Sequence, residues 1–114
     1  MGMALDFTGK TVLVIGAGRG LGKSIALMFA DCGADVYIVS RNTAQCEQAV
    51  EELKVKGVRA GYTKCDVAVP EDVEKLTADA VSFGGGKLDV VVNAAGVMSM
   101  EDILYTSAPE MSRL

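Results

Sequence analysis

Residues 11–22 read TVLVIGAGRGLG, an apolar and mostly β-branched run followed by a loop with four glycines. An apolar run of this kind predicts a strand over 11–15 that is covered on both faces, as in a parallel sheet. After the loop, the sequence predicts a helix over 22–31, closed by Gly33. The apolar residues that recur there at helical spacing, and that we expect to face the sheet, are Ile25, Met28 and Phe29.

The alternation of strand and helix continues along the chain. Further strands are predicted at 36–39, 59–65 and 88–93, with helices between them over 43–56 and 70–83. Alternating elements of this kind build a parallel sheet with helices on both faces and right-handed crossovers. The sequence therefore predicts an α/β fold with a doubly wound parallel sheet. The residues expected on the buried faces of these two helices are Cys46, Ala49, Val50, Leu53, Val73, Leu76, Ala80 and Phe83.

Composition limits the classes of function open to this chain. Of its 114 residues, 50% are hydrophobic and 23% are charged, and the net charge of −4 is spread along the chain. No run of like charge indicates a nucleic-acid or membrane-surface partner, and no apolar stretch is long enough to span a bilayer. The absence of histidine excludes Ser-His-Asp and Cys-His catalysis within the chain and disfavours zinc. The three cysteines form no CxxC pair, so we expect them to be reduced thiols. We also expect a soluble, cytoplasmic protein without a metal site.

The glycine loop falls between a strand and a helix, where an anion can bind. The first turn of a helix presents unpaired N–H groups and the positive end of the helix dipole, and together these bind a phosphate. A Cβ in the loop would hold a pyrophosphate away from these donors, which explains the need for glycine. A tight turn without a ligand is the alternative, but four glycines within residues 16–22 favour the phosphate site.

The spacing of the glycines points to one family. The pattern GxGxxG fails because Leu21 stands where the third glycine would be, whereas GxxxGxG fits from Gly16 to Gly22. The fit resembles the TGxxxGxG signature of the short-chain dehydrogenase/reductase family, with Ile15 in place of the threonine. The resemblance implies that this threonine supports the conformation of the turn. We therefore expect the loop to bind a nucleotide with Ile15 in its place.

Two further motifs carry the same resemblance. Residues 93–96, Asn-Ala-Ala-Gly, are similar to the family's NNAG motif after the fourth strand, with alanine at the second position. Asp66 and Val67 match the aspartate and hydrophobic pair that follows the third strand. The resemblance covers residues 7–114 and implies the N-terminal half of such an enzyme. Residues 1–114 would then be a partial dinucleotide-binding domain with a Rossmann-type sheet in the order 3-2-1-4, truncated after the fourth strand and without the catalytic half.

The resemblance also implies roles for single residues. Asp66 would accept a hydrogen bond from the adenine amino group, and Val67 would pack on the ring. Asn93 would steady the sheet, and the backbone of residues 94–96 would run beside the cofactor ribose. The residues expected to bind a nicotinamide dinucleotide are Gly16, Gly18, Arg19, Gly20, Leu21, Gly22, Ser40, Arg41, Asp66, Val67, Asn93, Ala94, Ala95 and Gly96.

The end of the second strand favours one dinucleotide over the other. An acidic side chain at that point hydrogen-bonds the free 2′-OH of NAD and repels the 2′-phosphate of NADP. This chain has Ser40 there, followed by Arg41, and Arg19 lies in the glycine loop. Two guanidinium groups that converge on one point form a site for a dianion, so the sequence favours NADP(H) over NAD(H). S-adenosylmethionine enzymes also have a glycine loop after the first strand, but they usually carry the acid that is missing here.

No catalytic residue is expected within these 114 residues. The resemblance implies hydride transfer assisted by a YxxxK tyrosine and lysine, a serine and an asparagine, all in the second half of the family's fold. The tyrosines at positions 37, 62 and 105 lack a lysine at that spacing. Two hypotheses follow. The first is the cofactor-binding part of an NADP(H)-dependent oxidoreductase that interconverts a small alcohol and a ketone or aldehyde. The full-length enzyme is then expected to be a homo-oligomer. The second is a truncated, non-catalytic nucleotide-binding module or fragment.

The composition of the fourth predicted strand bears on whether the chain is part of a larger fold. Residues 90–92 are valines, apolar on both faces as in a central strand. In the order 3-2-1-4 this strand would instead be an edge with an unpaired row of backbone groups, and only Asp89 would blunt it. We therefore expect the chain to be part of a larger fold.

Overall fold

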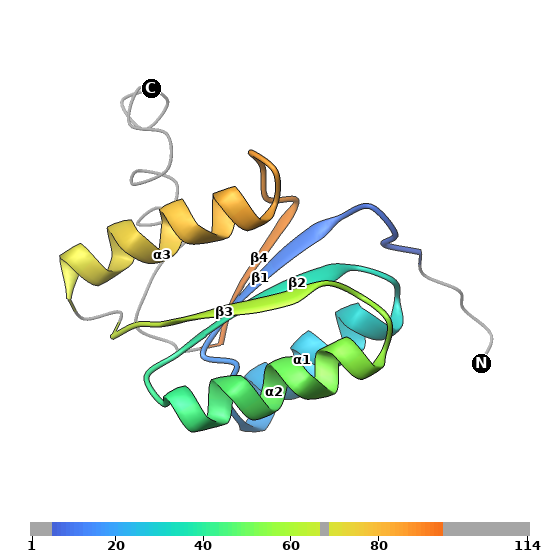
Figure 1. Ribbon diagram of the computed structural model, residues 1–114, viewed down its shortest axis with the longest axis horizontal. Helices are drawn as coiled ribbons and strands as arrows, with labels where there is room; N and C mark the ends of the chain where they lie inside the picture. The colour runs from blue at the N-terminus through green and yellow to red at the C-terminus, as the bar shows by residue number, and fades with distance from the viewer. Residues whose placement is uncertain (1–5, 67–68, 95–114) are drawn as a thin grey trace.

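Four parallel strands form the sheet of this computed structural model, which describes residues 6–66 and 69–94. The strands are β1 (Thr11–Ile15), β2 (Asp35–Ser40), β3 (Ala60–Lys64) and β4 (Val90–Asn93). Their order across the sheet is β3-β2-β1-β4 (Figure 1). β1 lies between β2 and β4, so that Leu13 stands opposite Tyr37 on one side and Val91 on the other. The predicted parallel sheet and its strand order are confirmed.

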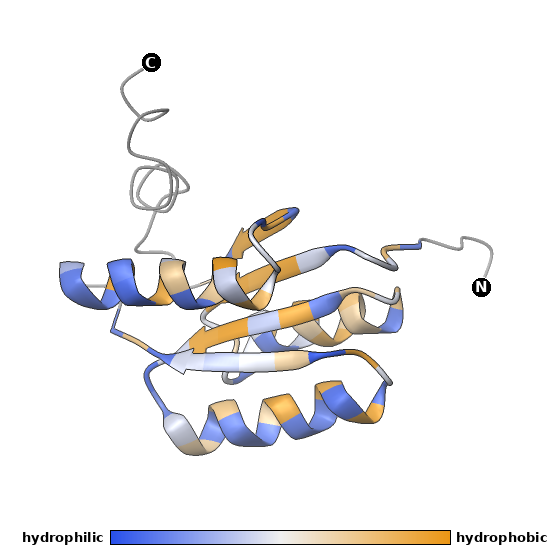
Figure 2. Cartoon of the chain, turned by 45° about the horizontal axis from the view of Figure 1, so that its top comes forward, coloured by the Kyte–Doolittle hydropathy of each residue, from blue (hydrophilic) through white to orange (hydrophobic). Residues whose placement is uncertain are grey.

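Helices cover both faces of the sheet. They are α1 (Gly20–Asp31), α2 (Thr43–Val55) and α3 (Pro70–Phe83). α1 and α2 lie on one face and α3 on the other, as Figures 1 and 2 both show. The predicted bounds agree with the observed ones to within about two residues, the usual uncertainty at the ends of elements. The largest differences are that α1 begins at Gly20 rather than Gly22 and β4 at Val90 rather than Leu88.

Alternate residues of the strands enter two apolar layers. Val12 and Val14 of β1 belong to the cluster under α1 and α2, whereas Leu13 and Ile15 belong to the cluster under α3. All five residues of β1 are buried, because strands lie on both sides of it and helices on both faces. The expected buried faces of α2 and α3 are confirmed, except that Phe83 is only half-buried.

The predicted buried face of α1 is wrong at Met28, and Ile25 is only half-buried. Met28 was expected to face the sheet, but it is 53% exposed. The residues that do face the sheet are small ones one helical turn apart, Gly22, Ala26 and Ala30. Small side chains let the helix lie close to the strands, and the larger Phe29 is left half-buried at the flank of the contact. Residue size, as well as helical spacing, therefore selects the packed face.

β4 is less covered than β1. All four of its residues are half-buried, although three of them are valines. Val90 and Val92 contact one apolar cluster and Val91 contacts the other. Among the described strands, β4 pairs with β1 alone, which makes it the edge that the sequence predicts.

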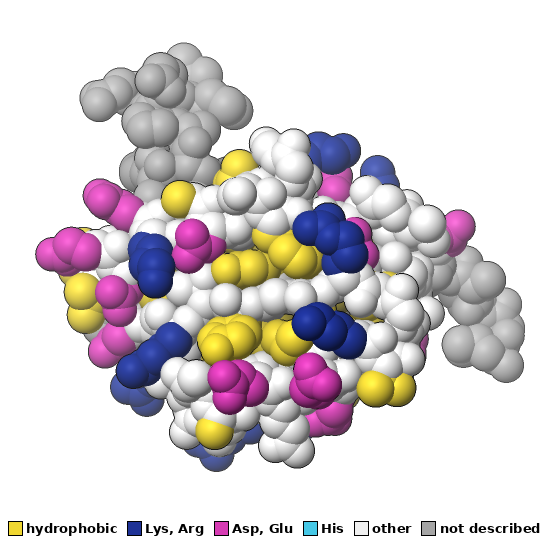
Figure 3. All heavy atoms as spheres, in the orientation of Figure 1, with side chains coloured by type: hydrophobic (Ala, Val, Ile, Leu, Met, Phe, Trp, Pro, Cys, Tyr) yellow, Lys and Arg dark blue, Asp and Glu magenta, His cyan; other side chains and the backbone are white. Residues whose placement is uncertain are grey.

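The surface shows charges of both signs. In Figure 3, basic and acidic side chains are interspersed with apolar ones over the face on which β3 lies, so this face has no uniformly basic area. No helix of the part of the chain that the structure describes is long and apolar enough to cross a membrane.

Candidate functional site

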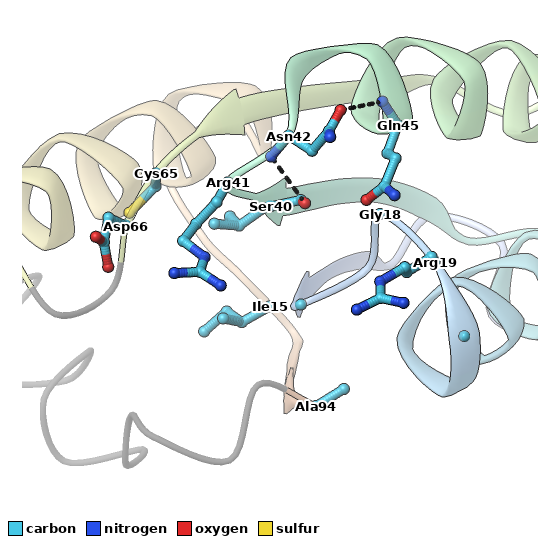
Figure 4. Close-up of a pocket in the computed structure, with 13 residues that line it drawn as sticks. Ile15, Gly18, Arg19, Ser40, Arg41, Asn42, Gln45, Cys65, Asp66 and Ala94 are labelled. Carbon is cyan, nitrogen blue, oxygen red and sulfur yellow. Dashed lines mark hydrogen bonds between the residues drawn. The ribbon is translucent and has the colours of Figure 1, made fainter.

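A cavity of about 940 Å³ opens at the carboxyl ends of the strands, where open α/β sheets bind their ligands. Its volume lies at the upper end of the range of about 300–1,000 Å³ typical of cofactor sites. The segments that follow all four strands contribute to it (Figure 4). The residues that line it are Ile15, Gly16, Gly18, Arg19, Gly20, Val39, Ser40, Arg41, Asn42, Gln45, Cys65, Asp66 and Ala94.

The structure brings together most of the described residues that were predicted to bind a dinucleotide. Those that line the cavity are Gly16, Gly18, Arg19, Gly20, Ser40, Arg41, Asp66 and Ala94. Three others do not line it: Leu21, which is 74% exposed, Gly22 and Asn93. Their contact with a dinucleotide stays a prediction. Val67, Ala95 and Gly96 lie outside the described residues.

Backbone hydrogen bonds hold the loop after β1 against the end of β2. The N–H groups of Gly16 and Ala17 donate to the carbonyl oxygen of Val39, at 2.8 and 3.1 Å. Gly16 adopts a φ of +82°, a left-handed conformation that favours glycine. The loop therefore leaves β1 in a defined direction and returns to α1 beside the cavity.

The glycines of this loop serve two different purposes. A Cβ on Gly22 would overlap the carbonyl oxygen of Gly16, and one on Gly18 would lie 2.5 Å from the hydroxyl oxygen of Ser40. A Cβ on Gly20 would meet no atom within 4 Å, although Gly20 lines the cavity. The expected reason for glycine, room for a ligand, therefore fits Gly20. At Gly18 and Gly22 a Cβ would also collide with other parts of the protein, so close packing is a further reason for glycine at these two positions.

The start of α1 is open to an anion. Its N-cap residue, Arg19, makes no side-chain capping hydrogen bond, and the first turn contains no acidic residue. The first N–H groups of a helix have no acceptor within the helix itself. Because Arg19 and Gly20 line the cavity, an anion bound there can accept these hydrogen bonds and interact with the positive end of the helix dipole.

Side chains of the turn after β2 form hydrogen bonds at the start of α2 and cap that helix. Asn42 Oδ1 accepts a hydrogen bond from the Gln45 N–H at 2.9 Å, and Ser40 Oγ accepts one from the Asn42 N–H at 3.2 Å. Asn42 and Gln45 also line the cavity. Neither was among the predicted site residues, although an asparagine between a strand and a helix is a recognisable N-cap signal.

Two arginines extend into the cavity from different elements. Figure 4 shows Arg41 leaving the end of β2 and Arg19 leaving the start of α1, with both guanidinium groups directed into the space between these elements. Ser40 lies at the wall between them. Both positive charges and Ser40 therefore border one cavity. That they converge on one bound group stays a prediction.

Cys65 and Asp66 form the wall after β3. The Cys65 N–H donates to the Ser40 carbonyl oxygen at 3.0 Å, and the Asp66 N–H donates to Oδ2 of Asp72 in α3 at 3.0 Å. Burial, followed by the nearby charges of Asp72 and Asp66, raises the pKa of the Cys65 thiol to about 11. The thiol is therefore protonated at neutral pH and is a poor nucleophile.

The segment after β4 approaches the cavity through the backbone. The Ala94 N–H donates to the Ile15 carbonyl oxygen at 2.9 Å, and Asn93 stands opposite Ile15 in the strand register. Ala94 therefore lies beside the loop that follows β1, where its backbone can border a ligand.

The described residues can bind a ligand here, but they place no evident proton-transfer pair at the cavity. Tyr37 lies under α3, where its hydroxyl is 2.6 Å from Thr63 Oγ1. The hydroxyl of Tyr62 is directed to Glu47 at 3.4 Å. Neither tyrosine lines the cavity. Residues 6–66 and 69–94 also contain no group of three or more His, Cys, Asp or Glu side chains that could hold a metal ion.

Sequence comparison finds oxidoreductases. A family model for short chain dehydrogenases matches residues 10–114. An uncharacterised oxidoreductase of Mycobacterium tuberculosis is 40% identical over 103 residues, which are 90% of this chain and 39% of that protein. The 7α-hydroxysteroid dehydrogenase of Escherichia coli K12 is 36% identical over 92 residues, 81% of this chain and 36% of that protein. The chain spans about two fifths of the length of the first curated relatives it matches.

Solved structures share the fold. A 7α-hydroxysteroid dehydrogenase complexed with NADH and 7-oxo glycochenodeoxycholic acid superposes with a TM-score of 0.79 at 30% identity, covering 95% of this chain and 50% of that chain. An NAD+-bound xylitol dehydrogenase superposes with a TM-score of 0.71 at 34% identity, covering 75% of this chain and 32% of that chain. Both of these structures contain a nicotinamide dinucleotide.

Proposed function

This chain belongs to the short-chain dehydrogenase family, and from that premise we propose that it binds NADP(H) as the cofactor-binding part of an oxidoreductase. The reaction would interconvert an alcohol and a ketone or aldehyde by hydride transfer. The family supplies the oxidoreductase class, whereas the choice of cofactor is argued from this chain's own residues.

One observation carries the proposal, namely the uncapped start of α1 beside the cavity. A pyrophosphate bound there would accept hydrogen bonds from the first-turn N–H groups. The open space at Gly20 is what such a group requires, because a Cβ at this position would reduce the room for it. The residues present therefore fit the phosphate-bearing part of a dinucleotide.

The preference for NADP(H) over NAD(H) rests on the side chains of the turn after β2. Ser40 stands where an acid would hydrogen-bond the 2′-OH, and Arg19 and Arg41 can both pair with a 2′-phosphate. The two solved relatives contain NAD+ and NADH, so they support the dinucleotide class and leave the preference to be tested on this chain.

The bound cofactor would donate or accept a hydride at its nicotinamide ring. The residues of this chain would bind and orient it: the loop after β1 at the pyrophosphate, Asp66 at the adenine amino group, and the segment from Ala94 beside the ribose. Proton transfer to the substrate oxygen would fall to the family's tyrosine, lysine and serine, for which the described lining residues offer no counterpart.

A second function is a nucleotide-binding module without catalysis. The observation that favours it is the lack of a tyrosine among the described residues that line the cavity. Under the first function we propose a small carbonyl or alcohol substrate, a cytoplasmic location and a homo-oligomer when the protein is full length. Under the second, NADPH would bind and no ketone or aldehyde would be reduced.

The proposal is tested by titrating the purified protein with NADPH and with NADH. We expect NADPH to bind at least about tenfold more tightly, and Arg41→Ala to weaken NADPH by roughly tenfold while NADH changes by less than about twofold. Lys54→Ala is the matched control, because it removes a positive charge from the last turn of α2, away from the cavity. A chain that binds neither dinucleotide would contradict the proposal. NADPH oxidation with a panel of ketones and aldehydes then separates the enzyme from the binding module.

A further inference from the structure

Gln45 joins the turn after β2 to the glycine loop after β1. It lies in the first turn of α2, and its side chain lines the cavity. Figure 4 shows its carboxamide directed back toward Gly18. The amide oxygen lies 3.0 Å from the point that a Cβ on Gly18 would occupy, and Ser40 Oγ lies 2.5 Å from the same point. The absence of a Cβ at Gly18 is therefore what allows Gln45 and Ser40 to meet the loop.

The charged side chains among the described residues that line the cavity are mainly positive. Arg19 extends into the cavity from the start of α1 and Arg41 from the end of β2, while Ser40 and Asn42 are neutral. Among the described lining residues, Asp66 at the end of β3 is the only acid. A carboxylate placed at residue 45 would thus have two guanidinium groups available as partners within the same cavity.

Helix stability does not explain a neutral residue at this position. The positive end of the helix dipole favours acidic side chains in the first turn, yet the first turn of α2 contains none. Glutamate at residue 45 would suit the helix at least as well as glutamine. What glutamate would change is the charge of the cavity, because it would neutralise positive charge that a bound anion needs.

We propose, on the basis of the NADP(H) binding proposed above, that Gln45 is a specificity-determining residue for the dinucleotide. Its neutral amide lies beside Gly18 in the cavity that Arg19 and Arg41 also line, and it leaves their charge available to the 2′-phosphate. The amide N–H₂ can also donate to that phosphate, whereas a glutamate there would accept from the 2′-OH and repel the phosphate.

The test compares four variants of the purified protein in titrations with NADPH and NADH at one fixed ionic strength. Gln45→Glu is expected to weaken NADPH binding by roughly tenfold, with NADH changed by less than about threefold. Gln45→Lys is expected to shift the ratio of the two affinities about threefold in the opposite direction. Gln48→Glu and Gln48→Lys are the matched controls, since Gln48 is exposed in the same helix and does not line the cavity; both should leave the ratio within about twofold.

Three results would overturn the inference, and they are distinguishable from one another. An affinity ratio that stays within about twofold of wild type in both Gln45 variants, or that moves the same way in both, removes Gln45 as the determinant while the proposed function stands. Equal shifts in the Gln48 variants assign the effect to the overall charge of α2. Wild-type protein that binds neither dinucleotide overturns the proposed function, and this inference with it. Thermal unfolding of each variant, expected to be unchanged within a few degrees, shows that the fold is intact.

Discussion

The turns after β1 and β2 border one cavity but start their helices in different ways. After β1, α1 begins beside Arg19 without any side-chain cap. After β2, α2 begins beside Asn42, whose side chain accepts a hydrogen bond from the Gln45 N–H at 2.9 Å. The turn after β1 therefore leaves the first N–H groups of α1 without a side-chain cap, whereas the turn after β2 caps its own helix and presents side chains to the cavity.

On our proposal, this difference matches the two parts of a dinucleotide. The pyrophosphate is common to NAD and NADP, and backbone N–H groups bind it whatever side chains are present. The ribose substituent differs between the two cofactors, and side chains can be exchanged to suit it. The turn after β1 would therefore supply affinity for either dinucleotide, and the turn after β2 would supply the selectivity between NAD and NADP.

The largest effect is expected from Gly22→Ala, which disrupts the packing of the first turn. Its Cβ would overlap the Gly16 carbonyl oxygen, so the loop or α1 must shift. We expect the free energy of unfolding, measured by urea denaturation, to fall by about 3 kcal/mol. Gly20→Ala is the control in the same loop, because its Cβ meets no atom within 4 Å. It should lose about 1 kcal/mol for an alanine at a φ of +62°. Equal losses would contradict the packing role of Gly22.

The turn after β3 provides a third case, in which an acid inside the helix supports the preceding loop. The N-cap Val69 offers no side-chain cap, and Asp72 accepts the Asp66 N–H at 3.0 Å. Asp72→Ala should lower the free energy of unfolding by about 1.5 kcal/mol, because a part-buried N–H loses a charged acceptor. Asp72→Asn keeps an acceptor oxygen and should recover part of the loss. The exposed first-turn acid Glu71 is the control, and Glu71→Ala with a loss as large as that of Asp72→Ala would refute the hydrogen-bond explanation.

A smaller effect is expected where the two turns differ most directly, at their N-caps. Asn42→Ala removes a capping hydrogen bond and should cost about 1 kcal/mol of unfolding free energy, whereas Asn42→Asp keeps the acceptor. Arg19→Ala removes no capping bond and should change stability by less than about 0.5 kcal/mol. Thermal or urea unfolding of the three variants measures the difference. Similar losses for Asn42→Ala and Arg19→Ala would show that the two helix starts are equivalent after all.

The smallest effect is expected at the opposite end of the sheet and depends on pH. The Thr11 N–H donates to Asp89 Oδ2 at 2.8 Å, and this hydrogen bond lowers the pKa of Asp89 below the ordinary value of an aspartate side chain. The carboxylate therefore stabilises the fold above the unfolded pKa, and the contribution is lost as the pH falls through the lower folded pKa. Asp89→Asn should be less stable than wild type near neutral pH, with the difference disappearing in strong acid. Urea unfolding over a pH series tests this, and a difference independent of pH would contradict it. Dinucleotide binding should not change.

Much of the fold follows from local patterns in the chain. The valine-rich run of β1 and its glycine loop predict a buried parallel strand and a turn into a helix, and the structure contains both. The buried face of α2 also follows, because four apolar residues recur there at helical spacing. The face of α1 does not follow, since helical spacing alone cannot reveal that the small residues Ala26 and Ala30, rather than Met28, meet the sheet.

The site is only partly visible from motifs. Arg19, Ser40 and Arg41 were identified from their places in the sequence, and they meet at the cavity. Asn42 and Gln45 were missed, because their contribution depends on how the turns after β1 and β2 pack together. The glycine motif after β1 does not include either residue. The close approach at Gly18 that brings these turns together is a contact between residues more than 20 positions apart.

The sequence by itself determined the order of strands and helices, the glycine loop after the first strand and the family, because periodicity and motif spacing are properties of neighbouring residues. Tertiary structure determined what surrounds the glycines of this loop. At Gly18 and Gly22 other parts of the protein lie where a Cβ would stand, whereas no atom lies within 4 Å of a Cβ on Gly20. It also determined that Gln45 reaches the cavity. These outcomes depend on which atoms lie opposite each missing Cβ, and atoms distant in the chain come into contact only when the sheet assembles.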